Sequence, residues 1–169
     1  VRNLLKKAIQ ANSPFAETYF ALAILYYGDH KYNEALPLFK KACDMSVQFR
    51  YKYNYADCLY RCGLANESID ILIELSKNWR NNDQSAKAYF LLGNIDAFQN
   101  HKDDARRIAM DLFSIDYSSL NIENFDMAEL MFLIDDYESS KILYESSNFL
   151  ETADWLEKYF YCLKSMNQI

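Results

Sequence analysis

Apolar residues recur along this chain at spacings of three, four and seven positions. In the clearest stretch they are Tyr19, Leu22, Ala23 and Tyr26, followed by Tyr32, Ala35, Phe39 and Ala42. Such spacings place apolar side chains on one face of a helix. The polar segment Gly28-Asp29-His30-Lys31 separates the two sets. The pattern therefore predicts a helical hairpin whose turn begins at Gly28.

The hairpin pattern recurs three more times along the chain. A small residue marks the equivalent position of each second helix: Ala35, Ser68, Ala105 and Ser140, with steps of 33, 37 and 35 residues between them. One such hairpin cannot bury its apolar face alone, so neighbouring copies are expected to stack. Small residues where two helices cross, such as Gly93, are expected to let the helices approach closely.

The period and the residue types resemble the tetratricopeptide repeat family. Tyr19 to Ala42 is the nearest copy, and Tyr89, Leu92 and Gly93 stand at the Trp-Leu-Gly positions of another, which departs from the family at Asp96. The resemblance implies an all-α fold: a right-handed superhelical solenoid of antiparallel helix hairpins with about ten helices.

We expect a single array over residues 1–169. Its expected parts are 1–15 (second helix of a partial repeat), 16–48, 49–85, 86–120 and 121–150 (four repeats), and 151–169 (first helix of a further repeat, or a cap). The partial repeats at both ends favour a piece of a longer array. The longest step places an insertion at Asn78–Ser85, which is predicted to be a loop with Asp83 or Ser85 capping the next helix.

Composition narrows the function. With 51% hydrophobic and 25% charged residues the chain is expected to be globular, and its net charge of −6 without a basic stripe argues against nucleic-acid binding. No apolar run is long enough for a membrane helix, so a cytoplasmic location is expected.

Cys58 and Cys62 share a helical face. The sequence offers no further residues that would complete a metal site there, and a disulfide between them is not expected. We therefore expect both to be small, partly buried apolar residues of a protein in a reducing compartment.

Catalytic chemistry has no support in the sequence. The two His residues, His30 and His101, both fall in predicted turns, and no nucleotide-binding or metal-protease motif is present. We therefore expect no enzyme activity, no cofactor and no metal.

The family resemblance implies that the first helices line a concave groove that binds a peptide or a partner protein. The candidate partner-binding residues are Phe20, Ile24, Tyr27, Arg50, Tyr53, Asn54, Asp57, Tyr60, Arg61, Lys87, Phe90, Asn94, Phe98, Glu129 and Phe132. Some family members clamp a carboxylate at such positions, but here Phe20, Ile24 and Leu91 replace three of the five clamping residues. We therefore expect an interaction module or scaffold that does not clamp a carboxylate.

Two other functions stay open at this point. One is a chaperone or co-chaperone that holds client polypeptides, and the other is a peptide-sensing regulatory domain of a larger protein. Self-association through the array ends is a further possibility, because the helix around Trp155 to Leu163 is strongly apolar.

Overall fold

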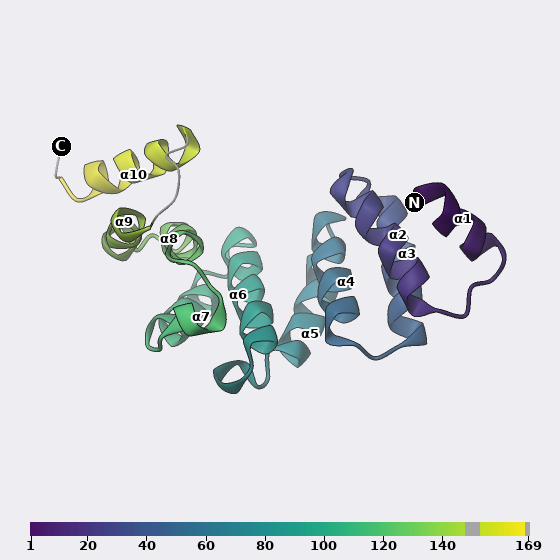
Figure 1. Ribbon diagram of the computed structural model, residues 1–169. Helices are drawn as coiled ribbons and strands as arrows, with labels where there is room; N and C mark the ends of the chain where they lie inside the picture. Colours follow the sequence, from purple (N-terminus) through teal and green to yellow (C-terminus); the bar gives the residue numbers. More distant parts are fainter. Residues whose placement is uncertain (148–152, 168–169) are drawn as a thin grey trace. The chain divides into compact units, whose positions relative to one another are not determined.

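The computed structural model describes residues 1–147 and 153–167, and all of its regular structure in those ranges is helical (Figure 1). The α-helices are α1 (Arg2–Gln10), α2 (Ala16–Gly28), α3 (Tyr32–Met45), α4 (Phe49–Arg61), α5 (Ala65–Leu75), α6 (Asp83–Phe98), α7 (Lys102–Phe113), α8 (Asn124–Leu133), α9 (Tyr137–Ser146) and α10 (Ala153–Ser165). Two 3₁₀ helices, η1 (Trp79–Asn81) and η2 (Tyr117–Leu120), flank α6 and α7. The predicted all-α class of helix hairpins is confirmed.

The chain forms two compact units, Val1–Lys77 (unit 1) and Asn78–Ile169 (unit 2). Unit 1 contains α1 to α5, and unit 2 contains η1 to α10. A single continuous array over both units remains a proposal. The expected boundary between the parts 121–150 and 151–169 lies outside the described residues.

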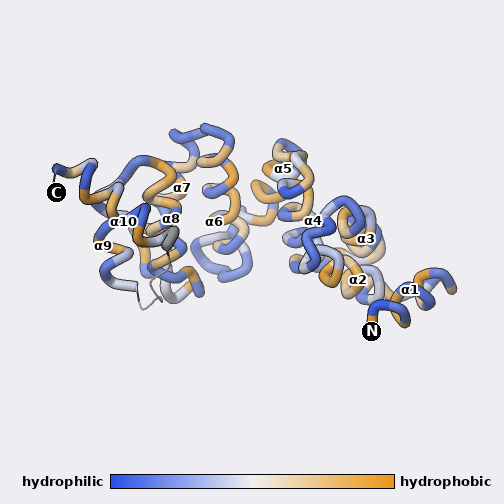
Figure 2. Tube along the Cα trace, turned by 90° about the horizontal axis from the view of Figure 1, so that it is seen from above, coloured by the Kyte–Doolittle hydropathy of each residue, from blue (hydrophilic) through white to orange (hydrophobic). Residues whose placement is uncertain are grey.

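Within each unit, consecutive helices pack as antiparallel hairpins. In unit 1, α2 packs on α3 and α4 on α5; in unit 2, α6 packs on α7 and α8 on α9. The four small positions of the second helices, Ala35, Ser68, Ala105 and Ser140, are all completely buried at these crossings. Along the hairpin helices, apolar and polar residues alternate with the helical period (Figure 2). Burial of the apolar stripe drives the packing, because hydrophobic burial is the largest favourable contribution to folding.

All four hairpins turn by the same backbone device. One residue in each turn, His30, Gly63, Asn100 or Asp135, adopts a left-handed conformation with φ between 59° and 82°. The following N–H then bonds back to the carbonyl five residues earlier, as in Lys31 N to Tyr26 O at 2.9 Å, a Schellman motif. The sequence predicted a turn that begins at Gly28, but Gly28 is the last residue of α2 and the left-handed residue is His30.

Gly93 sits where α6 crosses α7. A Cβ atom placed on it would lie 2.8 Å from Cγ2 of Ile108 and 3.6 Å from a methyl group of Leu130. The prediction that this glycine permits close helix approach is therefore confirmed. The crossing depends on the missing side chain because Ile is branched at Cβ and cannot easily turn away.

The segment Asn78–Ser85 is more ordered than the predicted loop. Trp79 is 7% exposed, and its ring stacks on Tyr89 with centroids 4.8 Å apart. The helix cap was also predicted wrongly: Asn82, not Asp83 or Ser85, caps α6, because its side chain accepts a hydrogen bond from the Ser85 N–H at 2.9 Å. Burial of the large apolar ring of Trp79 stabilises this segment, although most of its other residues are polar.

The two units differ in formal charge. Of the 18 Lys and Arg residues, 10 lie in unit 1 and 8 in unit 2; of the 24 Asp and Glu residues, 8 lie in unit 1 and 16 in unit 2. Unit 1 therefore carries +2 and unit 2 carries −8. None of the described helices has both the length and the apolar character needed to cross a bilayer.

Candidate functional site

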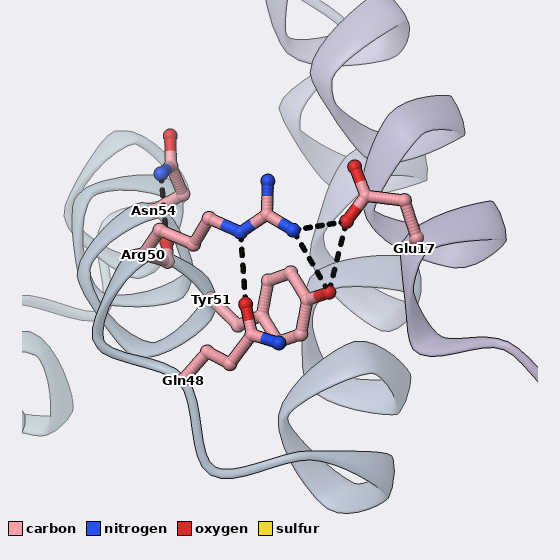
Figure 3. A network of polar contacts seen from close by, with 5 residues as sticks. All are labelled: Glu17, Gln48, Arg50, Tyr51 and Asn54. Carbon is pink, nitrogen blue, oxygen red and sulfur yellow. Dashed lines mark hydrogen bonds and ion pairs between the residues drawn. The ribbon is translucent and has the colours of Figure 1, made fainter.

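The first helices of the hairpins present the candidate surface, which we call the first-helix face. In unit 1 it is formed by α2 and α4. At one end of it the carboxylate of Glu17 on α2 accepts hydrogen bonds from the guanidinium of Arg50 and, at 2.9 Å, from the hydroxyl of Tyr51 (Figure 3). Arg50 also donates to the Gln48 side chain at 3.0 Å. This network ties the start of α4 to the start of α2.

Phe20 was predicted to contact a partner, and the structure corrects this. Only 9% of Phe20 is exposed, and its ring packs on Phe39 at 5.7 Å and on Tyr51 at 4.8 Å. The guanidinium of Arg50 covers the same ring at 5.2 Å. Helical spacing shows which face a ring lies on, but not that a neighbouring hairpin covers it, so Phe20 belongs to the core.

A second polar link lies at the other end of α2. Tyr27 donates from its hydroxyl to Asp57 at 2.6 Å, and Arg61 Nε lies 3.6 Å from the second oxygen of the same carboxylate. Burial, followed by the hydrogen bond to Asp57, raises the pKa of Tyr27 well above its usual value. Asp57 and Arg61, two of the predicted partner-binding residues, are therefore paired within the protein.

Two asparagines on first helices hydrogen-bond to the backbone of their own helix. Asn54 Nδ2 donates to the backbone oxygen of Arg50 at 2.8 Å, and Asn94 Nδ2 donates to that of Phe90 at 3.0 Å. Each amide keeps its carbonyl oxygen and one N–H for another partner, because a primary amide has two donors and one acceptor. Both asparagines are half-buried, which suits an amide that bonds to a peptide backbone.

The remaining candidates in unit 1 are mainly apolar or aromatic. Ile24 is 39% exposed, Tyr53 and Tyr60 are half-buried, and Phe49 stacks on Tyr53 with centroids 5.8 Å apart. The part of this surface left for a partner therefore consists of apolar side chains and an amide group.

In unit 2 the first helices are α6, α8 and α10. On α6, Lys87 is exposed, Phe90 is half-buried and Phe98 is 61% exposed. On α8, Glu129 accepts hydrogen bonds from the hydroxyl of Tyr144 and from the amine of Lys158.

The ring of Phe132, also on α8, meets those of Tyr137 and Tyr161 edge to face, each with centroids 5.7 Å away. Phe132, Glu157, Lys158 and Tyr161 line an open hollow of about 340 Å³ between α8 and α10.

Sequence reasoning missed three residues that shape these surfaces: Tyr51, Lys158 and Tyr161. Tyr51 follows the predicted residue Arg50 directly, but its ring turns into the core and only its hydroxyl reaches Glu17. Lys158 and Tyr161 lie on α10, whose helical period was recognised but whose packing on α8 was not. The local spacing of residues in the sequence does not show which side chain of another hairpin a residue will contact.

The described residues contain no group of three His, Cys, Asp or Glu side chains that could hold a metal ion. All four cysteines are free thiols, and burial raises the pKa of Cys58 to about 12 and that of Cys43 to about 11. The thiols of Cys58 and Cys43 therefore stay protonated near neutral pH and are poor nucleophiles. His101 lies 3.3 Å from Asp96, the residue that departs from the family pattern, and His30 lies 2.8 Å from the hydroxyl of Tyr32.

Comparison with solved structures supports the fold. The chain is similar to a structure from the functional characterization of PilF of Pseudomonas aeruginosa, with a TM-score of 0.71 and 18% sequence identity over 96% of this chain and 74% of that one. PilF contains tetratricopeptide repeats, so this chain shares a tetratricopeptide-like helical repeat fold. No family model matches the sequence, and no curated protein matches it either.

Proposed function

We propose that this chain is a non-catalytic interaction module that binds a peptide or a partner protein through its first-helix face. The observation that carries the proposal is the α2–α4 surface of unit 1. There the Glu17–Arg50 and Asp57–Arg61 charges neutralise one another, and Ile24 is left partly exposed. An apolar surface with the spare amide group of Asn54 suits a polypeptide, whose side chains fill apolar positions and whose backbone bonds to the amide.

The charge pairing also refines the expected ligand. Arg50 and Arg61 each face a carboxylate of the protein itself, so neither is a free cation for the carboxylate of a ligand. Terminal-carboxylate clamping by this surface is therefore not part of the proposal. Nucleic acid is not among the proposed partners, because unit 2 carries a formal charge of −8 and would repel phosphates.

Selection of random linear peptides on the immobilised chain tests this function. Each selected peptide is measured by fluorescence anisotropy against the wild type, Ile24→Glu and a Tyr53→Ala, Tyr60→Ala double variant. Ile73→Glu is the matched control, because Ile73 is 50% exposed but lies on the second helix α5. We expect Ile24→Glu to weaken binding about tenfold, since a charge replaces a desolvated apolar contact.

The proposal fails if no peptide is selected, or if no selected peptide is weakened by a substitution on the first-helix face of either unit. A shared sequence motif among the peptides supports a module with a defined partner. Unrelated apolar peptides of similar affinity support instead a chaperone that holds client chains. A peptide-sensing regulatory domain also predicts a shared motif, together with an effector domain in the same protein.

A second copy of the chain is another partner that the exposed apolar residues favour. Leu4 on α1 is 71% exposed and Leu156 on α10 is 46% exposed. We propose that such contacts join copies of the chain in a reducing, cytoplasmic setting. Sedimentation equilibrium of the wild type, Leu4→Lys and Leu156→Lys tests this; a wild type that stays monomeric at all concentrations would exclude it.

A further inference from the structure

The hollow between α8 and α10 has an equivalent in unit 1. Tyr27 and Tyr32 flank the first turn as Phe132 and Tyr137 flank the last, and both ring pairs meet edge to face, at 5.1 and 5.7 Å. On the following first helices, Asp57 precedes the completely buried Cys58, and Tyr161 precedes Cys162, which is also completely buried. Phe132 and Tyr161 therefore stand where Tyr27 and Asp57 stand in unit 1.

The two positions differ in chemistry. In unit 1 the hydroxyl of Tyr27 and the carboxylate of Asp57 bond to each other. In unit 2 Phe132 has no hydroxyl and Tyr161 has no carboxylate, so no polar link forms between them. Instead, the two rings meet edge to face and form part of the wall of the hollow, and Tyr161 keeps half of its surface exposed.

The three aromatic rings at the hollow do not form a cage for a bare cation. The rings of Phe132, Tyr137 and Tyr161 are in mutual contact, with centroids 5.3 to 5.7 Å apart, so no cation fits among them. Their outer edges and the space of about 340 Å³ beside them suit one large apolar side chain.

The charges around the hollow indicate which kind of residue the partner carries next to that apolar side chain. Lys158 is already neutralised by its ion pair with Glu129. Glu157 is exposed and has no ion pair or hydrogen bond within the described part of the chain. The unpaired charge at the hollow is thus negative, and it belongs to a unit whose formal charge is −8. A positively charged group on the partner would complement both.

We propose that the α8–α10 hollow binds a partner segment that presents a large apolar residue beside Lys or Arg. The apolar side chain packs against Phe132 and Tyr161, and the cation of its neighbour pairs with Glu157. The negative field of unit 2 speeds the encounter, so binding weakens as salt is added. This inference rests on the proposed function, because it assigns a ligand class to one part of the first-helix face.

The test uses the peptides selected on the full 169-residue chain. Affinities are measured for Tyr161→Ala and Glu157→Lys at low and high salt. The matched controls are Phe160→Ala, a 58% exposed ring on the same helix outside the hollow, and Glu138→Lys, an exposed acid on α9. We expect one class of peptides to lose about tenfold in affinity with Tyr161→Ala. The same class should lose about fivefold with Glu157→Lys and nothing with the controls.

Peptides of that class must share a large apolar residue next to Lys or Arg. Acidic or uncharged neighbours, or equal effects of the test and control variants, would overturn the proposal. If Tyr161→Ala loses helicity by circular dichroism, Glu157→Lys decides, because an exposed side chain can be exchanged without unfolding.

The outcomes also separate the two proposals. Peptides that depend on Ile24 but not on Tyr161 or Glu157 leave the proposed function standing and remove the inference. Dependence on neither surface removes both. A dimer that Tyr161→Ala dissociates in sedimentation equilibrium would make a second copy of the chain the occupant and also overturn the inference.

Discussion

The phenol of Tyr27 donates a hydrogen bond of 2.6 Å to the carboxylate of Asp57, which lies 30 residues further along the chain on the next hairpin. Arg61, one helical turn beyond Asp57, lies 3.6 Å from the other carboxylate oxygen. The three side chains join α2 to α4 on the surface that we propose binds a partner. They therefore hold the first-helix face together while removing net charge from it.

Loss of the Tyr27 hydroxyl is expected to destabilise the protein. Tyr27→Phe takes a donor away from a largely buried carboxylate, which costs about 1–3 kcal/mol. Tyr26→Phe is the control: its neighbouring ring is half-buried, and its hydroxyl makes no hydrogen bond within the described structure. Urea unfolding of both variants provides the measurement. Equal free energies of unfolding for the two would show that the link to Asp57 contributes nothing.

Alkaline pH is expected to weaken the fold through Tyr89. Burial, and then the 2.7 Å hydrogen bond to Asp111, raise the pKa of Tyr89 from 10.0 to about 12. Between these values the unfolded chain has released the phenolic proton and the folded chain has kept it, so the stability of the folded state falls as pH rises. Tyr89→Phe removes this contribution. Its free energy of unfolding should fall less between pH 10 and 12 than that of the wild type; parallel curves would contradict the assignment.

Alanine substitutions at two equivalent serines are expected to change the stability of the protein in opposite directions. The Oγ of Ser68 is buried without a hydrogen-bond partner, whereas Ser140 Oγ donates to the backbone oxygen of Ala128 at 2.9 Å. Ser68→Ala removes an unsatisfied polar group and should stabilise the protein by about 1 kcal/mol, while Ser140→Ala loses a bond and should cost about the same. Thermal unfolding of both variants checks this. Destabilisation by Ser68→Ala would mean that its hydroxyl is satisfied in solution.

Gly93→Ala is expected to lower stability although alanine favours helices. The new methyl group would lie 2.8 Å from Ile108 Cγ2, and overpacking of this kind costs about 1–3 kcal/mol. The gain in helix propensity is only about 1 kcal/mol. Gly28→Ala is the matched control, since a Cβ there meets nothing within 4 Å. We expect a lower Tm for Gly93→Ala and an unchanged or higher one for Gly28→Ala; the reverse order would refute the close crossing.

Much of the fold was predictable because it depends on local periodicity. Ala35, Ser68, Ala105 and Ser140 were identified as equivalent from their spacing alone, and all four are buried at helix crossings. The turns were placed correctly but not their geometry. His30 has a side chain that disfavours the left-handed conformation, and it adopts that conformation because the Schellman bond and the packed hairpin hold it there.

The candidate surface was less predictable. Spacing placed Ile24 and Tyr27 on one side of a helix, and the structure leaves Ile24 partly exposed there while Tyr27 bonds to Asp57. The same reasoning put Phe20 on that surface, and Tyr51 and Phe39 bury it. Residues 31 and 19 positions away in sequence decide that burial, and no local pattern contains them.

The sequence by itself determined the helices, their pairing into hairpins and the small residues at their crossings, because a helical period and a steric limit act over a few residues. The tertiary structure decided which charges are neutralised and which are left for a partner. Arg50 and Asp57 look alike in the sequence as charged surface residues, yet each faces an opposite charge within unit 1, while Glu157 faces none among the described residues. Ion pairs of this kind require atoms from different parts of the chain within a few ångströms, and only folding brings them together.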